Sequence, residues 1–234
     1  MKTKATQAIW VLAIAGALNM TVFAAEREAK VDDRLDAAAD ALHDMMKASD
    51  HGIPQDLIDK AHCIVVIPGM KKAGFIIGAK YGRGFAACRK PGGVGWSAPA
   101  AMRVEGGSVG FQIGGSDTDV VLLVMNDHGM RHLLADKFTI GGEATAAAGP
   151  VGRDASAQTD AVMRAEMLSY SRSSGLFAGI SLEGATLRPD EDTDRELYGR
   201  SITNREILTG NVTTPPNAAK FIHALNRESV VPTH

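Results

Sequence analysis

The sequence predicts an α+β domain: a curved, Gly-rich, mainly antiparallel sheet or barrel-like core flanked by helices. From Ala73 to Met125, apolar β-forming residues come in short bursts separated by Gly or Pro pairs about every ten residues, which is typical of antiparallel strands joined by tight turns. This stretch holds more glycines than turns alone require, so some are expected inside strands, at bulges or close backbone approaches. Helical periodicity before and after it predicts the flanking helices. The 234 residues, 45% of them hydrophobic, suit one domain with a sizeable core.

The first 25 residues predict an export signal. Lys2 and Lys4 precede the apolar run Ala8–Leu18, and small residues around Ala24 provide a cleavage site. The run is short and acidic residues follow it at once, so a cleaved signal is favoured over an uncleaved anchor. We therefore expect a periplasmic or envelope-associated protein. Four segments are expected: residues 1–25 as signal peptide, 26–62 as an N-terminal helical segment, 63–200 as the sheet core with helices, and 201–234 as a C-terminal helical extension.

Residues 27–49 predict an amphipathic helix, because Val31, Leu35 and Leu42 recur at helical spacing between acidic residues. Packing on the sheet is favoured, since anionic membranes would repel the acidic face; membrane contact is the alternative. Pro54 then opens a short helix over Gln55–Ala61.

The strands are expected to begin with Cys63–Ile67, which Pro68-Gly69 ends, paired as a hairpin with Ala73–Ala79. Of the later strands, Asp119–Met125 is apolar on both faces and therefore expected to be central. After a turn at Asn126–Gly129, the other expected elements are strands Ser97–Glu105, Ser108–Gly114 and Leu176–Leu187, helices Met130–Phe138, Asp154–Ser173 and Asp190–Tyr198, a capping box at Thr203 and Glu206, and a last amphipathic helix through Phe221 and Leu225.

Basic residues are concentrated in the sheet core. No Asp or Glu occurs between Gly69 and Val104, so this stretch would attract anions such as lipid headgroups, unless its cations are simply solvated strand ends. In a meander of short strands, Lys71-Lys72 and Arg89-Lys90 would share one edge and jointly hold a phosphate. Trp96 would lie near that end, at a membrane interface or packed in the core. The candidate lipid- or anion-binding residues are Lys71, Lys72, Lys80, Arg83, Arg89, Lys90 and Trp96.

Other motifs are weaker. Gly106–Gly110 matches the G-x-S-x-G nucleophile elbow, but a strand rather than a helix is expected after Ser108, so Ser108 is interpreted as a turn residue. His128 and His132 have the spacing of two metal ligands, but Gly129 intervenes and no third ligand is evident nearby, so no metal site is expected. The acids Asp190, Asp192, Asp194 and Glu196 lack the glycine of a calcium loop and are interpreted as a solvated helix end.

Cys63 and Cys88 are the two cysteines of the chain. Export would permit a disulfide between them, but burial as two free thiols is equally compatible with the sequence.

Several segments in order resemble the SYLF-domain family of lipid-binding proteins, from about Ala38 to about Gly199. They are IVVIPGMKKAGFIIGAKYGRG, GGVGWSAPA, GGSVGFQIGGSDTDVVLLVMN, AGPVGRDASAQTDA and AEMLSYSRSSGLFAGISLEGATL. The resemblance implies binding of anionic phospholipid, phosphatidylinositol-type lipids in eukaryotic relatives, and it carries an actin-binding label in yeast relatives. In an exported bacterial-style protein, only the general anionic-lipid activity is expected to transfer.

The sequence thus predicts a non-enzymatic lipid-binding protein with no cofactor, no metal and no nucleic-acid partner. Its partners would be anionic phospholipids or a membrane surface. The alternatives are an envelope structural or protein-interaction module and, less favoured, a serine hydrolase acting through Ser108.

Overall fold

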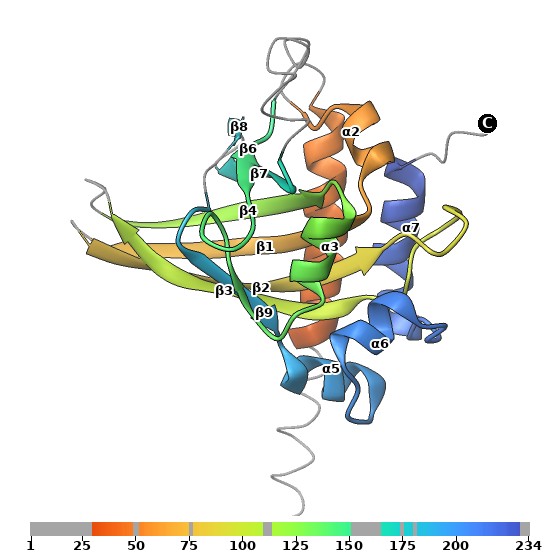
Figure 1. The fold of residues 1–234 in the computed structure, drawn as a ribbon. Helices are drawn as coiled ribbons and strands as arrows, with labels where there is room; N and C mark the ends of the chain where they lie inside the picture. The colour runs from red at the N-terminus through yellow and green to blue at the C-terminus, as the bar shows by residue number, and fades with distance from the viewer. Residues whose placement is uncertain are drawn as a thin grey trace, which may run out of the picture.

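The computed structural model describes residues 30–48, 52–74, 77–109, 114–150, 165–173, 176–179 and 182–229. The predicted export signal lies outside these residues, as do positions 154–164 of the predicted helix Asp154–Ser173. The described chain is α+β, as the sequence predicts, with one curved sheet and helices against both of its faces (Figure 1).

The sheet follows the order β5-β9-β3-β2-β1-β4-β7-β6, with β8 paired to β7. Among the described residues, every pairing of these strands except β6–β7 is antiparallel. The central position predicted for the apolar strand before Asn126 is confirmed, because β4 lies between β1 and β7. The strands are β1 (Cys63–Gly74), β2 (Ile77–Cys88), β3 (Ala100–Val109), β4 (Gly114–Val124), β5 (Phe138–Thr139), β6 (Ala146–Ala148), β7 (Met167–Ser173), β8 (Leu176–Gly179) and β9 (Ala185–Pro189).

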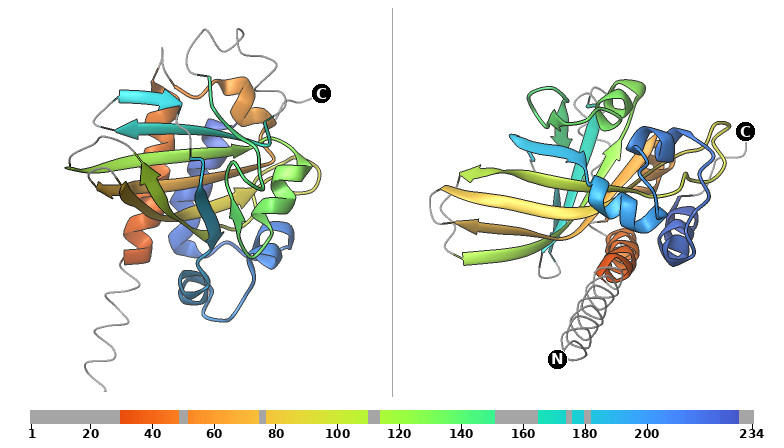
Figure 2. Two further views of the ribbon diagram at one scale, coloured as in Figure 1. Left: turned by 60° about the vertical axis from the view of Figure 1, so that its left-hand side comes forward. Right: turned by 90° about the horizontal axis from the view of Figure 1, so that it is seen from below.

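The helices form a layer on each face of the sheet (Figure 2). The helix of residues 30–47, here called α1, packs with α2 and α7 on one face, while α3 and α6 cover the other. Among the described helices, none is both long and apolar enough to cross a bilayer. Besides α1 they are α2 (Gln55–Lys60), α3 (Asp127–Leu133), α5 (Glu191–Tyr198), α6 (Asn204–Thr209) and α7 (Ala219–Glu228).

Along the central strands, apolar side chains point alternately to the two faces of the sheet and so contribute to both hydrophobic cores. In β1, Ile64 and Val66 face α1 and α7, whereas Val65 and Ile67 face the layer of α3 and α6. All four side chains are fully buried. Successive strand residues point to opposite faces, so a run that is apolar throughout is what a sheet covered on both sides requires.

The predicted role of α1 in packing on the sheet is confirmed. Leu35 and Leu42 are fully buried in the core. Part of its acidic face contacts the C-terminal segment: Asn217 donates a hydrogen bond to Asp32 (2.6 Å), and Lys220 pairs with Asp40 (3.1 Å). The predicted capping box is also present, with Thr203 and Glu206 bonding each other's backbone N–H.

The expected hairpin turn at Pro68-Gly69 is wrong. β1 runs on to Gly74, and these two residues form a bulge at which the register with β2 and β4 shifts. Gly69 adopts a φ of 54°, and its N–H donates to the Asp119 carboxylate (2.9 Å). A proline is tolerated in a strand at a bulge, where its missing N–H interrupts no ladder bond.

Further expected elements differ. The helix expected over Met130–Phe138 corresponds to α3, which ends at Leu133, and Phe138 begins β5. Residues 167–173 form β7 rather than the end of a helix, because Leu168 and Tyr170 face one core while Met167 faces the other, the two-residue period of a strand. The expected strand Leu176–Leu187 is divided into β8 and β9, with Gly184 at a φ of 72° between them. The turn expected at 126–129 is instead the start of α3, because the Asn126 side chain caps its first turn.

Candidate anion-binding site

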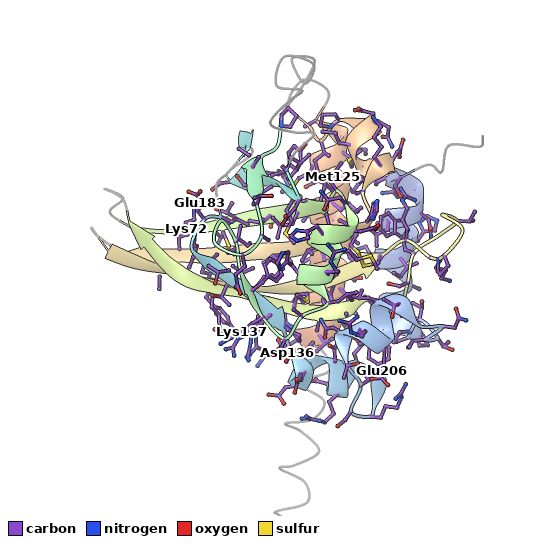
Figure 3. All side chains as sticks on the ribbon, viewed as in Figure 1. Lys72, Met125, Asp136, Lys137, Glu183 and Glu206 are labelled. Atoms are coloured by element: carbon purple, nitrogen blue, oxygen red, sulfur yellow. A yellow bond between two sulfur atoms is a disulfide. The ribbon has the colours of Figure 1, made fainter. Side chains whose placement is uncertain are left out.

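Three lysines lie near the hairpin end of β1 and β2, in the part of the sheet that extends beyond the helices (Figure 1). Lys72 is directly opposite Lys80 in the β1–β2 register, so both side chains are on the same face of the sheet. Lys71 points to the other face, opposite Tyr81 and Asp117. We call Lys71, Lys72 and Lys80 the lysine cluster; Lys72 is labelled in Figure 3, as is Glu183 from the turn before β9.

Lys80 is held across the neighbouring strand. Its ammonium group donates to the Glu183 carbonyl oxygen (3.1 Å), and its side chain is only 7% exposed. Its path crosses Gly106 of β3, where a Cβ would lie 3.2 Å from Lys80 Cε and 3.0 Å from Ala185 Cα. Gly106 thus confirms the prediction that some strand glycines mark close approaches.

Burial, and then the charge of Lys72, lower the pKa of Lys80. Among the described residues, no carboxylate forms an ion pair with Lys72 or Lys80. Like charges directly opposite each other on a strand pair are destabilising, so an anion between the two ammonium groups would relieve their repulsion. Lys71 does pair with Asp117 (3.4 Å), but both side chains are more than two-thirds exposed and such pairs contribute little.

Arg83 belongs to a different cluster. It lies opposite Arg103 in β3, which lies opposite Arg188 in β9. Two carboxylates pair with these three arginines: Asp190 contacts Arg83 (3.3 Å), and Glu105 contacts both Arg103 (3.4 Å) and Arg188 (2.8 Å). Each arginine of the row thus already has a carboxylate partner within the chain.

Arg89 and Trp96 are structural. Arg89 donates to the carbonyl oxygens of Ile58, Asp59 and Ala61, which end α2, and its guanidinium lies 4.5 Å from the centre of the Trp96 ring. Trp96 is 2% exposed and donates its indole N–H to the Ser229 hydroxyl (2.9 Å). Of the two positions considered for Trp96, the structure shows the packed one.

The expectation that Lys71-Lys72 and Arg89-Lys90 share an edge is wrong. Cys63 lies opposite Cys88, so Arg89 and Lys90 follow the end of β2 that is remote from the hairpin. Lys72 is nine positions beyond Cys63 in β1, about 30 Å at the usual rise of a strand. Because β1 does not turn at Pro68-Gly69, the two basic pairs are at opposite ends of the sheet.

Of the acids at the start of α5, Asp192 is exposed, as the sequence suggested, but Asp190 and Asp194 do not belong to a solvated helix end. Asp190 and Asp194 are 2% and 0% exposed, respectively. Asp194 accepts a hydrogen bond from the Ala101 N–H (2.7 Å), and Asp190 accepts one from the Thr193 hydroxyl (2.9 Å). Burial is the main reason why the pKa of Asp194 rises to about 8. These acids connect α5 to β3.

The two cysteines form a disulfide, which the sequence left undecided. Cys63 and Cys88 face each other across β1 and β2, and both are fully buried. Ser108 is inside β3, opposite Gly78, so the expected turn at this position is wrong. In the described part of the chain, Ser108 and Val109 both continue the extended strand β3, whereas a nucleophile elbow places its serine at a sharp turn.

One polar cluster in the structure was not predicted from the sequence. His128 and His132 on α3 lie beside Glu166, which immediately precedes β7, and their ligand atoms are all within 4.8 Å of one another. The expectation that His128 and His132 have no third ligand nearby is therefore wrong. Glu166 is 34 positions beyond His132, and only the pairing of β7 with the end of β4 brings it to α3. Interpreting the apolar run MLSY after Glu166 as a strand beside β4 would have placed Glu166 near the histidines.

The fold defines a class: an α+β domain with a curved, mainly antiparallel sheet between two helical layers and a lysine-rich hairpin at one end. Comparison with known proteins identifies the family. A family model described as "Ysc84: Las17-binding protein actin regulator" matches residues 105–228. The chain belongs to this family, the Ysc84/SYLF domain family, which is associated with lipid and actin binding and is generally non-catalytic.

Similar proteins come from animals and yeast. The chain is 37% identical over 176 residues to the SH3 domain-containing YSC84-like protein 1 of Xenopus laevis, covering 74% of this chain and 52% of that protein. The human protein of the same name is 34% identical over 175 residues, covering 74% and 51%. Protein YSC84 of Saccharomyces cerevisiae is 33% identical over 180 residues, covering 76% and 38%. The chain thus spans about half or less of these relatives.

Proposed function

We propose that this chain is an exported, non-enzymatic protein that binds anionic phospholipid headgroups through the lysine cluster. The observation that carries the proposal is the direct opposition of Lys72 and Lys80, two cations on one face. The family's association with lipid binding supports the same chemistry. Export rests on the predicted signal at residues 1–25.

The site we propose is smaller than the one inferred from sequence. Arg89 and Trp96 are committed to packing and to the end of α2, and Arg83 is paired with Asp190. A phosphodiester approaching the hairpin end would meet Lys72 first, because Lys72 is the more exposed of the two. Lys71, on the other face, would add to the attraction of a negatively charged membrane surface.

Vesicle sedimentation tests this proposal. The exported form of the chain, with its N-terminus mapped by intact mass, would be mixed with vesicles of phosphatidylcholine alone or with added phosphatidylglycerol or cardiolipin. We expect binding only to the anionic vesicles, weakening as salt is raised. Each lysine near an anionic surface contributes about 1 kcal/mol, so the K71E/K72E double variant should bind at least about thirtyfold more weakly.

Lys90→Glu is the matched control, because Lys90 is an exposed lysine at the opposite end of the sheet. It should bind nearly as well as the unaltered chain. An equal loss per reversed lysine in K71E/K72E and K90E would show that only overall charge matters and would overturn the proposed site. No binding to any anionic vesicle would overturn the proposed function and favour an envelope protein-interaction role, which crosslinking in intact cells would then address.

A further inference from the structure

The cluster on α3 has a defined geometry. Asn126 caps α3 by accepting a hydrogen bond from the Gly129 N–H (2.9 Å), and the helix that follows carries His128 and His132 one turn apart. Their rings meet edge to face, with centroids 4.8 Å apart. Residues four apart lie on the same side of a helix, which is the arrangement by which two histidines share a metal ion.

Glu166 reaches this pair from the sheet. Its carbonyl oxygen accepts from the Met125 N–H (2.8 Å), which extends the β4–β7 pairing up to the start of α3. Glu166 also donates its own N–H to the Thr145 hydroxyl (3.2 Å). The position of its backbone is therefore set by two neighbouring segments.

The Glu166 carboxylate is oriented as well as placed. Its Oε2 accepts from the Thr145 N–H (3.0 Å), and its Oε1 contacts His128 Nδ1. The side chain is 12% exposed, whereas that of His128 is 53% exposed. A carboxylate fixed by a backbone N–H on one oxygen and presenting the other to a histidine is typical of an oriented metal ligand.

The hydrogen-bonding capacity of His132 is not satisfied within the described residues. Its Nε2 is buried and, within the described residues, has no hydrogen-bond partner; the nearest carboxylate oxygen, Glu166 Oε2, is 3.9 Å away. A buried nitrogen without a partner costs free energy. A metal ion bound to Nε2 would satisfy it.

We propose that His128 Nδ1, His132 Nε2 and the Glu166 carboxylate bind a divalent transition metal ion, with Zn²⁺ the best match. Imidazole and carboxylate are the ligands of zinc and its neighbours in the series, whereas Ca²⁺ and Mg²⁺ prefer oxygen alone. Zinc bonds nitrogen and oxygen at about 2.0–2.2 Å, so tetrahedral ligand atoms are about 3.4 Å apart. The described atoms lie within 4.8 Å, so small side-chain rotations bring them to that spacing.

The site has consequences for stability and access. Bound metal would tie α3 to the start of β7 and so stabilise the folded state. Three protein ligands leave a fourth tetrahedral position open, and the half-exposed His128 places it at the surface for water or an incoming ligand. The site uses none of the lysine cluster and is independent of the proposed lipid binding.

Calorimetric titration of the chelator-treated full chain with Zn²⁺ at pH 7 tests the proposal, together with thermal unfolding with and without the metal. We expect one ion per chain, a dissociation constant below about 10 µM, and a rise in Tm. H132A and E166Q should each weaken binding at least about tenfold. Mg²⁺ at the same concentration should give no heat and no rise in Tm.

Two further variants keep the test decisive. H223A removes an exposed histidine of α7, outside the cluster, and should bind zinc like the unaltered chain. H128A removes the half-exposed ligand and should keep the fold, so it replaces H132A should that variant unfold. No zinc uptake at 100-fold the expected constant, or equal loss in H223A and H128A, would overturn the proposal and leave His128 and Glu166 as an ion pair only.

Discussion

The buried Asp194 should make the stability of the fold depend on pH. Its side chain is fully buried, one carboxylate oxygen accepts from the Ala101 N–H (2.7 Å), and the other has no hydrogen-bond partner among the described residues. Burial first, and then the neighbouring Asp190 and Glu191, raise the pKa of Asp194 from an ordinary 3.8 to about 8. In the folded state this carboxyl group is therefore mostly protonated at neutral pH, whereas in the unfolded chain it is ionised.

The sign and size of the effect follow from proton linkage. Between pH 4 and pH 8 the folded state binds one more proton at this site than the unfolded state, so stability is highest below the unfolded pKa and is lost as pH rises through the folded pKa. One proton corresponds to about 1.4 kcal/mol per pH unit. From pH 5 to pH 7 the free energy of unfolding should fall by about 2.5 kcal/mol on account of Asp194 alone.

Urea denaturation at pH 5, 6 and 7 measures this, with fluorescence of the buried Trp96 as the signal. Asp194→Asn gives the matched comparison, because the amide can still accept from Ala101 but does not titrate. The difference in unfolding free energy between the unaltered chain and D194N should move by about 2.5 kcal/mol across the range, while other titrating groups cancel. A difference that stays within about 0.5 kcal/mol would refute the linkage argument.

Two other predictions concern the β1–β2 pair, each checked by urea denaturation. The C63S/C88S double variant should lose about 3.5 kcal/mol, since the bridge spans 25 residues in sequence and cross-linking a loop of that length removes this much unfolded-state entropy; a loss below 1 kcal/mol would contradict it. Gly84→Ala should cost more than about 3 kcal/mol, because the new Cβ would lie 1.9 Å from the Val66 carbonyl oxygen; Gly107→Ala, where the same atom meets nothing within 4 Å, should be far milder.

The sequence predicts the class of the fold because its strongest signals are local. The apolar run before Asn126, the periodicity of α1 and the capping box at Thr203 are each confirmed. In each case a short segment determines which of its faces is buried, or which N–H needs a partner. Patterns of this kind need no knowledge of distant residues.

The error at Pro68-Gly69 affected the candidate site. A Pro-Gly pair between apolar residues favours a turn as much as a bulge, and the sequence does not distinguish them. Interpreting it as a turn placed Lys71-Lys72 beside Arg89-Lys90, whereas the continuous β1 separates the two pairs by the length of the sheet. Strand register, and not residue type, decided which cations meet.

Contacts between distant segments could not be predicted either. From sequence alone Arg89 is a plausible anion ligand, but in the structure its guanidinium donates hydrogen bonds to three carbonyl oxygens at the end of α2. The position of Glu166 beside the two histidines was not predicted because they belong to a helix that precedes it by more than 30 residues. Both depend on which elements pack together, which local periodicity does not specify.

Cys63 and Cys88 close one end of a strand pair whose other end is joined by the chain itself. Residues 63–88 and the disulfide therefore form a closed covalent ring, whose two strands lie in the middle of the sheet. Strands that belong to one ring can neither drift apart nor slide past each other by more than the slack of the loop. While the disulfide is intact, β1 and β2 therefore stay close to each other even when the rest of the sheet has separated.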